Sequence, residues 1–203
     1  MRYITGGLVL FFLLVLIYLL FRLWMESRRE RINPSRIPGE DLPTDLREGA
    51  LCPLRQLKTY YEKRDIEQVD ACIDETMLPE ELLILGTNPG EIFCGREGAK
   101  CLLQGDWKYW GQLELNVEET ALSRVGSALY FVMRGQIRLD IWRFRIPIKI
   151  TGVLEKRNDL WRISKLQFIN DLNTNYVIFA WGAAIALTVS LLLLGFSWLP
   201  GIF

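Results

Sequence analysis

Acid–base chemistry in this 203-residue chain would have to come from tyrosines and carboxylates, because the sequence contains no histidine. By residue type, Tyr60 or Tyr61 could donate a hydroxyl proton, and Asp106, Glu91 or Asp140 could act as a carboxylate base. Their surroundings favour simpler roles. The tyrosines belong to a helix that must pack on a sheet, Asp106 follows a glycine near a helix end, and Glu91 follows the turn sequence Asn-Pro-Gly. The sequence therefore identifies no catalytic residue, and whether the protein is an enzyme stays open at this point.

Metal and nucleic-acid chemistry are also disfavoured. The chain has four cysteines but no CxxC spacing and no histidine, which argues against a zinc site, so no metal and no cofactor is predicted. Apolar neighbours predict that the cysteines are small core residues kept as thiols in a reducing compartment, although an even number would also allow two disulfides in an exported domain. The 24 basic residues balance 24 acidic ones without a basic stripe, so no nucleic-acid partner is expected.

Two long apolar segments frame the chain. Residues 4–24 carry a single charge, Arg22, and residues 176–203 carry none. Each segment exceeds the roughly 20 residues that cross a hydrocarbon core, so we expect transmembrane helices at residues 4–24 and 176–196 in a lipid bilayer. A cleaved signal peptide is disfavoured, because the first segment is longer than a signal-peptide core and no small-x-small cleavage site follows it.

The charges beside the first segment predict its orientation. Only Arg2 precedes the segment, whereas five arginines occur at its end or within the twelve residues after it: Arg22, Arg28, Arg29, Arg31 and Arg36. Basic flanks stay on the cytoplasmic side of a membrane. We therefore expect an integral membrane protein whose central domain is cytoplasmic and whose termini lie on the opposite side.

Small residues recur in the second apolar segment at a spacing that allows close helix packing. Ala180 and Ala184 form one pair, and Gly182 and Ala186 form another. These residues are candidates for helix–helix contacts. Because one helix would suffice as a tether, two spans suggest a fixed domain that pairs with other membrane protein subunits or with a second copy as a homodimer.

The polar middle of the chain begins with helices. Residues 25–49 read as a basic flank and linker, residues 50–170 as a folded domain, and residues 171–175 as a second linker. Helical spacing after Pro53 predicts a first helix, with the proline in its first turn. Asp65 then opens a second helix in a capping-box variant, and Arg96 to Trp110 forms a third.

Strands follow the helices. Residues 82–85 are short and apolar, and an alternation of period two begins at Leu113. Longer strands are expected at residues 128–139, 144–151 and 160–168, with a turn or bulge at Ile141–Trp142 and a reversal at Asn158–Asp159. The order predicts an α+β class in which N-terminal helices pack on a curved antiparallel sheet.

Three sequence blocks carry a resemblance to a known family: residues 86–98, residues 106–111, and the closing stretch from Gly152 through Ser164. From about residue 54 to 170 the chain resembles the SnoaL-like branch of the nuclear transport factor 2-like (NTF2-like) superfamily, which has a cone fold. The resemblance implies an apolar pocket at the wide end of the cone, open to a small apolar ligand. Gln167 stands where many relatives carry a histidine, and Trp161 is expected to be a buried anchor of the last strand. The pocket candidates are Tyr60, Tyr61, Trp107, Trp110, Trp161 and Gln167.

Two functions fit these observations. One is a non-catalytic, membrane-anchored module that binds a partner or a ligand, for example as an accessory subunit of a membrane complex. The alternative is an enzyme similar to ketosteroid isomerase or a cyclase, acting on a lipid-soluble substrate. The missing histidine and the absence of a carboxylate from the apolar runs favour the first.

Overall fold

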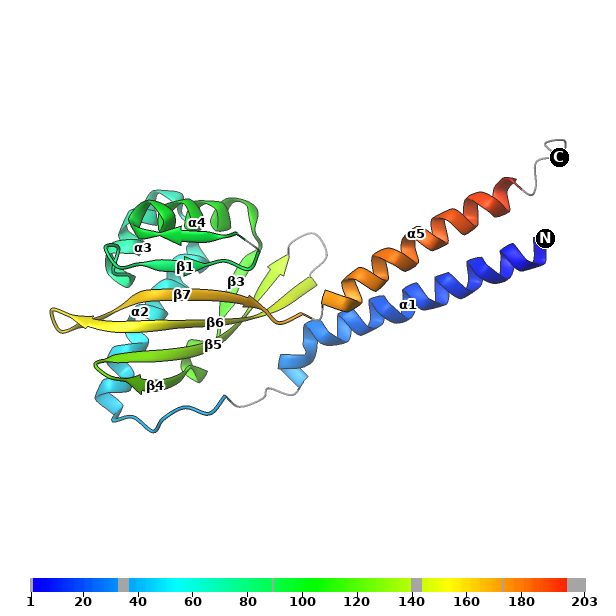
Figure 1. Cartoon of the computed structure of the whole chain (residues 1–203). Coiled ribbons are helices and arrows are strands. Elements are labelled where there is room, and N and C mark those ends of the chain that lie inside the picture. Colours follow the sequence, from blue (N-terminus) through cyan, green and yellow to red (C-terminus); the bar gives the residue numbers. More distant parts are fainter. Residues whose placement is uncertain (1, 33–36, 89, 140–143, 173, 197–203) are drawn as a thin grey trace. The chain divides into compact units, whose positions relative to one another are not determined.

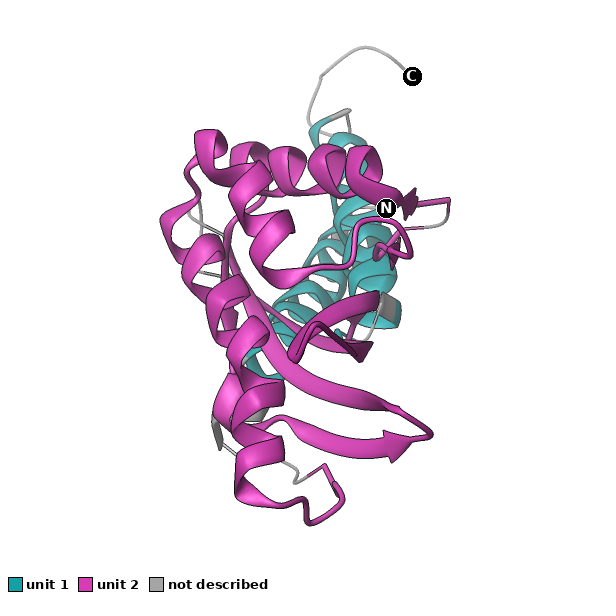
Figure 2. Ribbon diagram, turned by 90° about the vertical axis from the view of Figure 1, so that its left-hand side faces the viewer, with its two compact units in different colours: residues 1–32, 172–203 teal, residues 33–171 magenta. Residues whose placement is uncertain are grey.

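A computed structural model places two compact units, shown in different colours in Figure 2. One unit comprises residues 1–32 and 172–203, and the other comprises residues 33–171. The structure describes residues 2–32, 37–88, 90–139, 144–172 and 174–196.

The first unit is a pair of helices, α1 (Arg2–Ile32) and α5 (Thr174–Phe196), which lie side by side (Figure 1). Both are long and apolar enough to cross a membrane, over Ile4–Ser27 and Asn175–Gly195. Leu19 and Leu23 of α1 pack with Ala180 and Ala183 of α5. The Arg22 guanidinium donates a hydrogen bond of 2.7 Å to the Tyr176 hydroxyl.

The small residues of α5 differ in how far the helix pair buries them. Ala180 is buried in the helix pair, and Ala184 and Ala186 are partly buried. Gly182 is exposed, and a Cβ at this position would meet nothing within 4 Å. Contact of Gly182 with another protein, including a second copy, stays a prediction.

The second unit combines helices with a curved mixed sheet (Figure 1). Its strands run in the order β2-β1-β7-β6-β5-β3, and β4 also pairs with β5. The helical elements are α2 (Thr44–Lys63), the 3₁₀ turn Ile66–Gln68, α3 (Val69–Thr76), α4 (Gly95–Tyr109) and the 3₁₀ turn Val117–Glu119. The strands are β1 (Leu83–Leu85), β2 (Ile92–Cys94), β3 (Gln112–Leu115), β4 (Ala121–Val125), β5 (Ala128–Leu139), β6 (Phe144–Arg157) and β7 (Leu160–Asn170).

The α+β class is confirmed, but the sheet is not purely antiparallel. β1 pairs with β7 in parallel, whereas the other strand pairs are antiparallel among the residues that the structure describes. The reversal at Asn158–Asp159 is confirmed: both residues have positive φ, 49° and 62°, as a two-residue hairpin turn requires. The turn or bulge expected at Ile141–Trp142 lies outside the described residues.

The first domain helix begins earlier than the sequence indicated. α2 starts at Thr44, so Pro53 lies inside the helix and not in its first turn. A proline in a helix interior costs about 3 kcal/mol. Burial of α2 residues on both sides of Pro53, including Ala50 and Leu54, offsets this cost.

The last strand also departs from simple alternation. The register between β6 and β7 shifts between Val153 and Leu154, and the neighbouring residues Ile163 and Ser164 are both buried. Beyond the shift, side chains therefore point to the opposite face of the sheet from the one that strict alternation predicts. Trp161 is only partly buried, at the border of the core.

The cysteines were predicted to be core residues, and this is correct only for Cys72. Cys52, Cys94 and Cys101 are exposed, and all four thiols are free. The core forms where α2, α3 and α4 meet the sheet, and Phe131 of β5 is the largest of its fully buried side chains.

Candidate functional site

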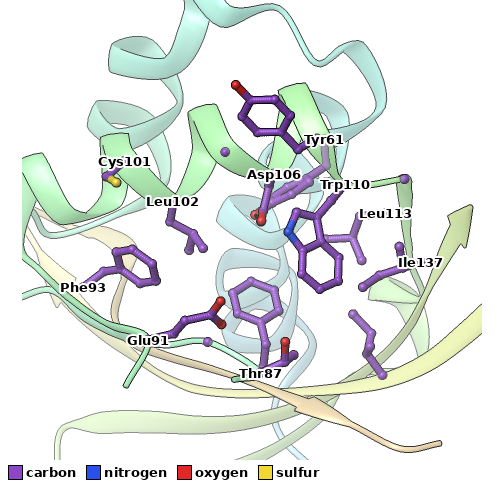
Figure 3. A pocket seen from close by; sticks show the side chains of 16 residues that line it. Tyr61, Thr87, Glu91, Phe93, Cys101, Leu102, Asp106, Trp110, Leu113 and Ile137 are labelled. Atoms are coloured by element: carbon purple, nitrogen blue, oxygen red, sulfur yellow. Dashed lines mark hydrogen bonds between the residues drawn. The ribbon is translucent and has the colours of Figure 1, made fainter. Parts of the chain in front are cut away.

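A cavity of about 190 Å³ opens between α4, the β1–β2 segment and the sheet (Figure 3). Most of its walls are apolar or aromatic, and its polar side chains are few. The lining residues are Tyr61, Gly86, Thr87, Glu91, Phe93, Cys101, Leu102, Gly105, Asp106, Tyr109, Trp110, Gly111, Leu113, Ile137, Ile148 and Phe168.

Asp106, in the last turn of α4, and Tyr61 of α2 form a polar pair in the cavity wall. The Tyr61 hydroxyl donates a hydrogen bond of 2.8 Å to Asp106 Oδ2. Tyr61 is buried, and its ring meets the ring of Trp107 edge to face, with centroids 6.0 Å apart. The tyrosine is therefore locked by packing, and its hydroxyl is held in place for the carboxylate.

Arg64 joins the two helices that carry this pair. It ends α2 in the left-handed conformation, with φ 52°. Its guanidinium donates to the backbone oxygen of Trp107 at 2.6 Å and to that of Asp106 at 3.4 Å. A cation is favoured at the unsatisfied carbonyls of a helix C-terminus. Arg64 thus fixes the end of α2, with Tyr61, against the end of α4, with Asp106.

The protonation of the pair follows from its surroundings. Burial raises the pKa of Asp106 to about 6, and the Glu91 carboxylate adds to this, whereas the Tyr61 hydrogen bond and Arg64 act in the opposite direction. Burial, then the Asp106 charge, raises the pKa of Tyr61 well above its ordinary value. At neutral pH, Tyr61 remains a donor and Asp106 is largely ionised.

Glu91 is a second carboxylate in the cavity, carried by the segment between β1 and β2 (Figure 3). Its oxygens accept hydrogen bonds from the backbone N–H of Asn88 at 3.0 Å and from Asn88 Nδ2 at 2.7 Å. A Cβ at Gly86 would overlap the Glu91 carboxylate. Glycine at position 86 therefore provides the space that the Glu91 carboxylate occupies.

The structure distributes the predicted pocket residues between the cavity and other places. Tyr61 and Trp110 line the cavity. Tyr60 lies beside Glu75 of α3, and Trp107 is buried in the core. Trp161 packs beside α2, where a Cβ at Gly49 would lie 3.3 Å from Trp161 Cδ1, and Gln167 is exposed on β7.

The sequence indicated a turn role for Asp106 and a backbone cap for Glu91. Glu91 does cap the backbone N–H of Asn88, and both carboxylates also line the cavity, which the sequence analysis did not predict. Asp140 lies outside the described residues. The sequence held one signal for Asp106. It is spaced three and seven residues after the buried Leu103 and Ala99, and it therefore falls on the apolar stripe of its helix.

The sequence matches no model of a known protein family, and no curated protein matches it. Solved structures do match. A protein of unknown function from Pseudomonas putida KT2440, described as NTF2-like, aligns with a TM-score of 0.52 over 63% of this chain and 88% of its own, at 9% identity. An NTF2-like superfamily protein from Salmonella enterica aligns with a TM-score of 0.52 over 64% of this chain and 94% of its own, at 13% identity.

The domain has the NTF2-like fold. A protein of unknown function with a cystatin-like fold from Nostoc punctiforme gives the same TM-score, 0.52, at 12% identity over 65% of this chain and 96% of its own. These three alignments cover 63–65% of this chain and 88–96% of the matched chains. At these identities the likeness establishes the fold and not the activity. The SnoaL-like branch stays a prediction.

Proposed function

We propose that the protein is a membrane-anchored binding module whose NTF2-like domain holds a small, largely apolar molecule in the cavity beside Asp106. One observation carries this proposal. The cavity has apolar and aromatic walls and few polar groups, chiefly the hydrogen-bonded pair of Asp106 and Tyr61 and the carboxylate of Glu91. Pockets for small molecules combine such walls with a few fixed polar groups.

The size of the cavity limits the ligand. A dry apolar cavity of about 150 Å³ binds benzene, and this cavity measures about 190 Å³. It therefore suits one ring with a short substituent, on the order of ten non-hydrogen atoms.

An acid–base enzyme is the second candidate, and the raised pKa of Asp106, about 6, favours it. The geometry of Tyr61 argues the other way. In enzymes that stabilise an oxyanion, preorganised donors point at the developing charge. Here the Tyr61 hydroxyl donates to Asp106 itself. The donor and the base of such a mechanism are thus hydrogen-bonded to each other. This arrangement supports binding without turnover better than catalysis.

Filling the cavity tests the proposal. A Cβ at Gly105 would meet nothing within 4 Å, so Gly105→Leu should fit in α4 while its side chain occupies the cavity. We expect phenethyl alcohol, which has one ring and a short polar chain, to show saturation-transfer NMR signals with the full chain in lipid nanodiscs. Gly105→Leu should abolish these signals.

Gln104→Leu is the matched control, because Gln104 is exposed on the same helix and is not among the lining residues. This variant should bind the alcohol as the unaltered chain does, and empty nanodiscs give the background. Equal signals from Gly105→Leu and the unaltered chain would show that the alcohol binds elsewhere, and the proposed function would fail.

We also propose that the domain is cytoplasmic, on the basis of the arginines that follow the first apolar segment. The exposed thiols of Cys52, Cys94 and Cys101 make the test simple. A membrane-impermeant maleimide should leave intact cells unlabelled and label all three after permeabilisation. An extra cysteine added after Phe203 should react in intact cells. Labelling of the three native thiols without permeabilisation would place the domain outside.

A further inference from the structure

The charge of the cavity is unbalanced. Two carboxylates, Asp106 and Glu91, line it, and no lysine or arginine is among the described lining residues. The sequence has no histidine that could supply a positive charge. The Arg64 guanidinium, whose charge lowers the pKa of Asp106, donates to backbone carbonyls at the end of α4 and is not among the lining residues. The formal charge of the described lining residues is therefore negative.

Aromatic rings share the cavity wall with the two carboxylates. Phe93, Trp110 and Phe168 contribute rings to the walls, from β2, the end of α4 and β7. The face of an aromatic ring carries partial negative charge and attracts a cation within about 6 Å of its centre. Rings and carboxylates in this cavity thus favour the same sign of ligand charge.

The Asp106 carboxylate also has an oxygen that Tyr61 does not use, because the tyrosine donates to Oδ2. A ligand with an N–H donor could reach Oδ1, and a charged donor makes the stronger hydrogen bond to a carboxylate. An anionic ligand would be repelled by both carboxylates. A neutral hydroxyl could bind, but without the attraction of opposite charges.

We infer that the ligand of this cavity is a small organic amine in its ammonium form, with a single ring or similar apolar body among the aromatic side chains and its cationic group beside Asp106 and Glu91. This inference rests on the proposed function and narrows it from small apolar molecules to cationic ones. The apolar body accounts for most of the lining, and the ammonium group accounts for the two acids.

Three compounds of nearly equal size separate charge from shape: phenethylamine, phenethyl alcohol and phenylacetate. Calorimetric titration of each into the full chain in nanodiscs of zwitterionic lipid is expected to give a Kd for the amine roughly tenfold or more below that of the alcohol. Phenylacetate should not bind measurably. Gly105→Leu gives the background of binding outside the cavity.

The variants Asp106→Asn and Glu91→Gln should each reduce the preference for amine over alcohol. Glu97→Gln is the matched control, because Glu97 is an exposed acid of α4 that does not line the cavity. It should keep the full preference.

The outcomes are distinct. Equal or tighter binding of the alcohol by the unaltered chain would overturn the amine inference and leave the proposed function standing. A preference for the amine that survives in both Asp106→Asn and Glu91→Gln would also overturn it. If none of the three compounds binds more tightly than it does to Gly105→Leu, the proposed function fails as well.

Discussion

Replacing Phe131 by alanine is expected to lower the free energy of unfolding by about 3–5 kcal/mol. The Phe131 ring is fully buried on β5, which pairs with β3, β4 and β6. It lies over Gly152 of β6, where a Cβ would overlap both the ring and the Lys165 carbonyl oxygen. The neighbouring strands are thus shaped around this ring, and its removal leaves a cavity that they cannot close.

Trp161→Ala is the informative comparison. The sequence indicated that Trp161 is a buried anchor, but the side chain is partly buried at the border of the core. Truncation should therefore cost less, about 1–2 kcal/mol. Pulse proteolysis of the full chain in nanodiscs across a urea series measures both variants. A larger loss for Trp161→Ala than for Phe131→Ala would contradict the packing described here.

Asp106→Asn is expected to make the domain more stable at neutral pH. The pKa of Asp106 is raised from 3.8 to about 6 in the folded protein, chiefly by burial. A raised pKa means that the fold favours the protonated acid, so the stability from this group is fully present below about pH 4 and is lost as pH rises towards 6. Asparagine is always neutral, and its carbonyl can still accept the Tyr61 hydrogen bond.

The expected gain at neutral pH is on the order of 1–2 kcal/mol, after allowance for the solvent that reaches this half-buried carboxylate. The gain should vanish below about pH 4, where the aspartic acid is protonated too. The groups that face Asp106 are Tyr61, Glu91 and Arg64. The same proteolysis assay at both pH values measures the difference, with Glu97→Gln as the control.

A loss of stability in Asp106→Asn at neutral pH would mean that the carboxylate holds the fold together. A gain would mean that the chain keeps a destabilising charge in its cavity, as proteins do at sites retained for function.

Local signals in the sequence predicted much of the fold. The hairpin at Asn158–Asp159 could be read because two adjacent residues determine it, and both have positive φ. The helix at residues 96–110 could be read because a stripe of buried residues repeats along it. The parallel pairing of β1 with β7 could not be predicted, because it joins residues about 80 positions apart and leaves no local pattern in the sequence.

The candidate site was harder to predict for the same reason. Tyr61 and Asp106 are 45 residues apart in sequence, and only the tertiary fold brings the end of α2 to the end of α4. The burial that raises the pKa of Asp106 is a property of that fold. The glycine before Asp106 indicated a turn. The spacing of Asp106 from Ala99 and Leu103 instead places Asp106 on the buried face of the helix.

Protection of Cys101 from alkylation tests the central claim, that this cavity binds a small molecule, most directly. Cys101 lines the cavity and is exposed, whereas Cys52 and Cys94 are exposed and do not line it. Peptide mass spectrometry resolves the alkylation rates of the three thiols in the full chain. One sample thus contains a reporter thiol in the cavity, Cys101, and two reference thiols outside it. Phenethylamine or phenethyl alcohol at saturation should slow Cys101 several-fold and leave Cys52 and Cys94 unchanged. An unchanged rate at Cys101 with both compounds, or equal slowing of all three thiols, would contradict the claim.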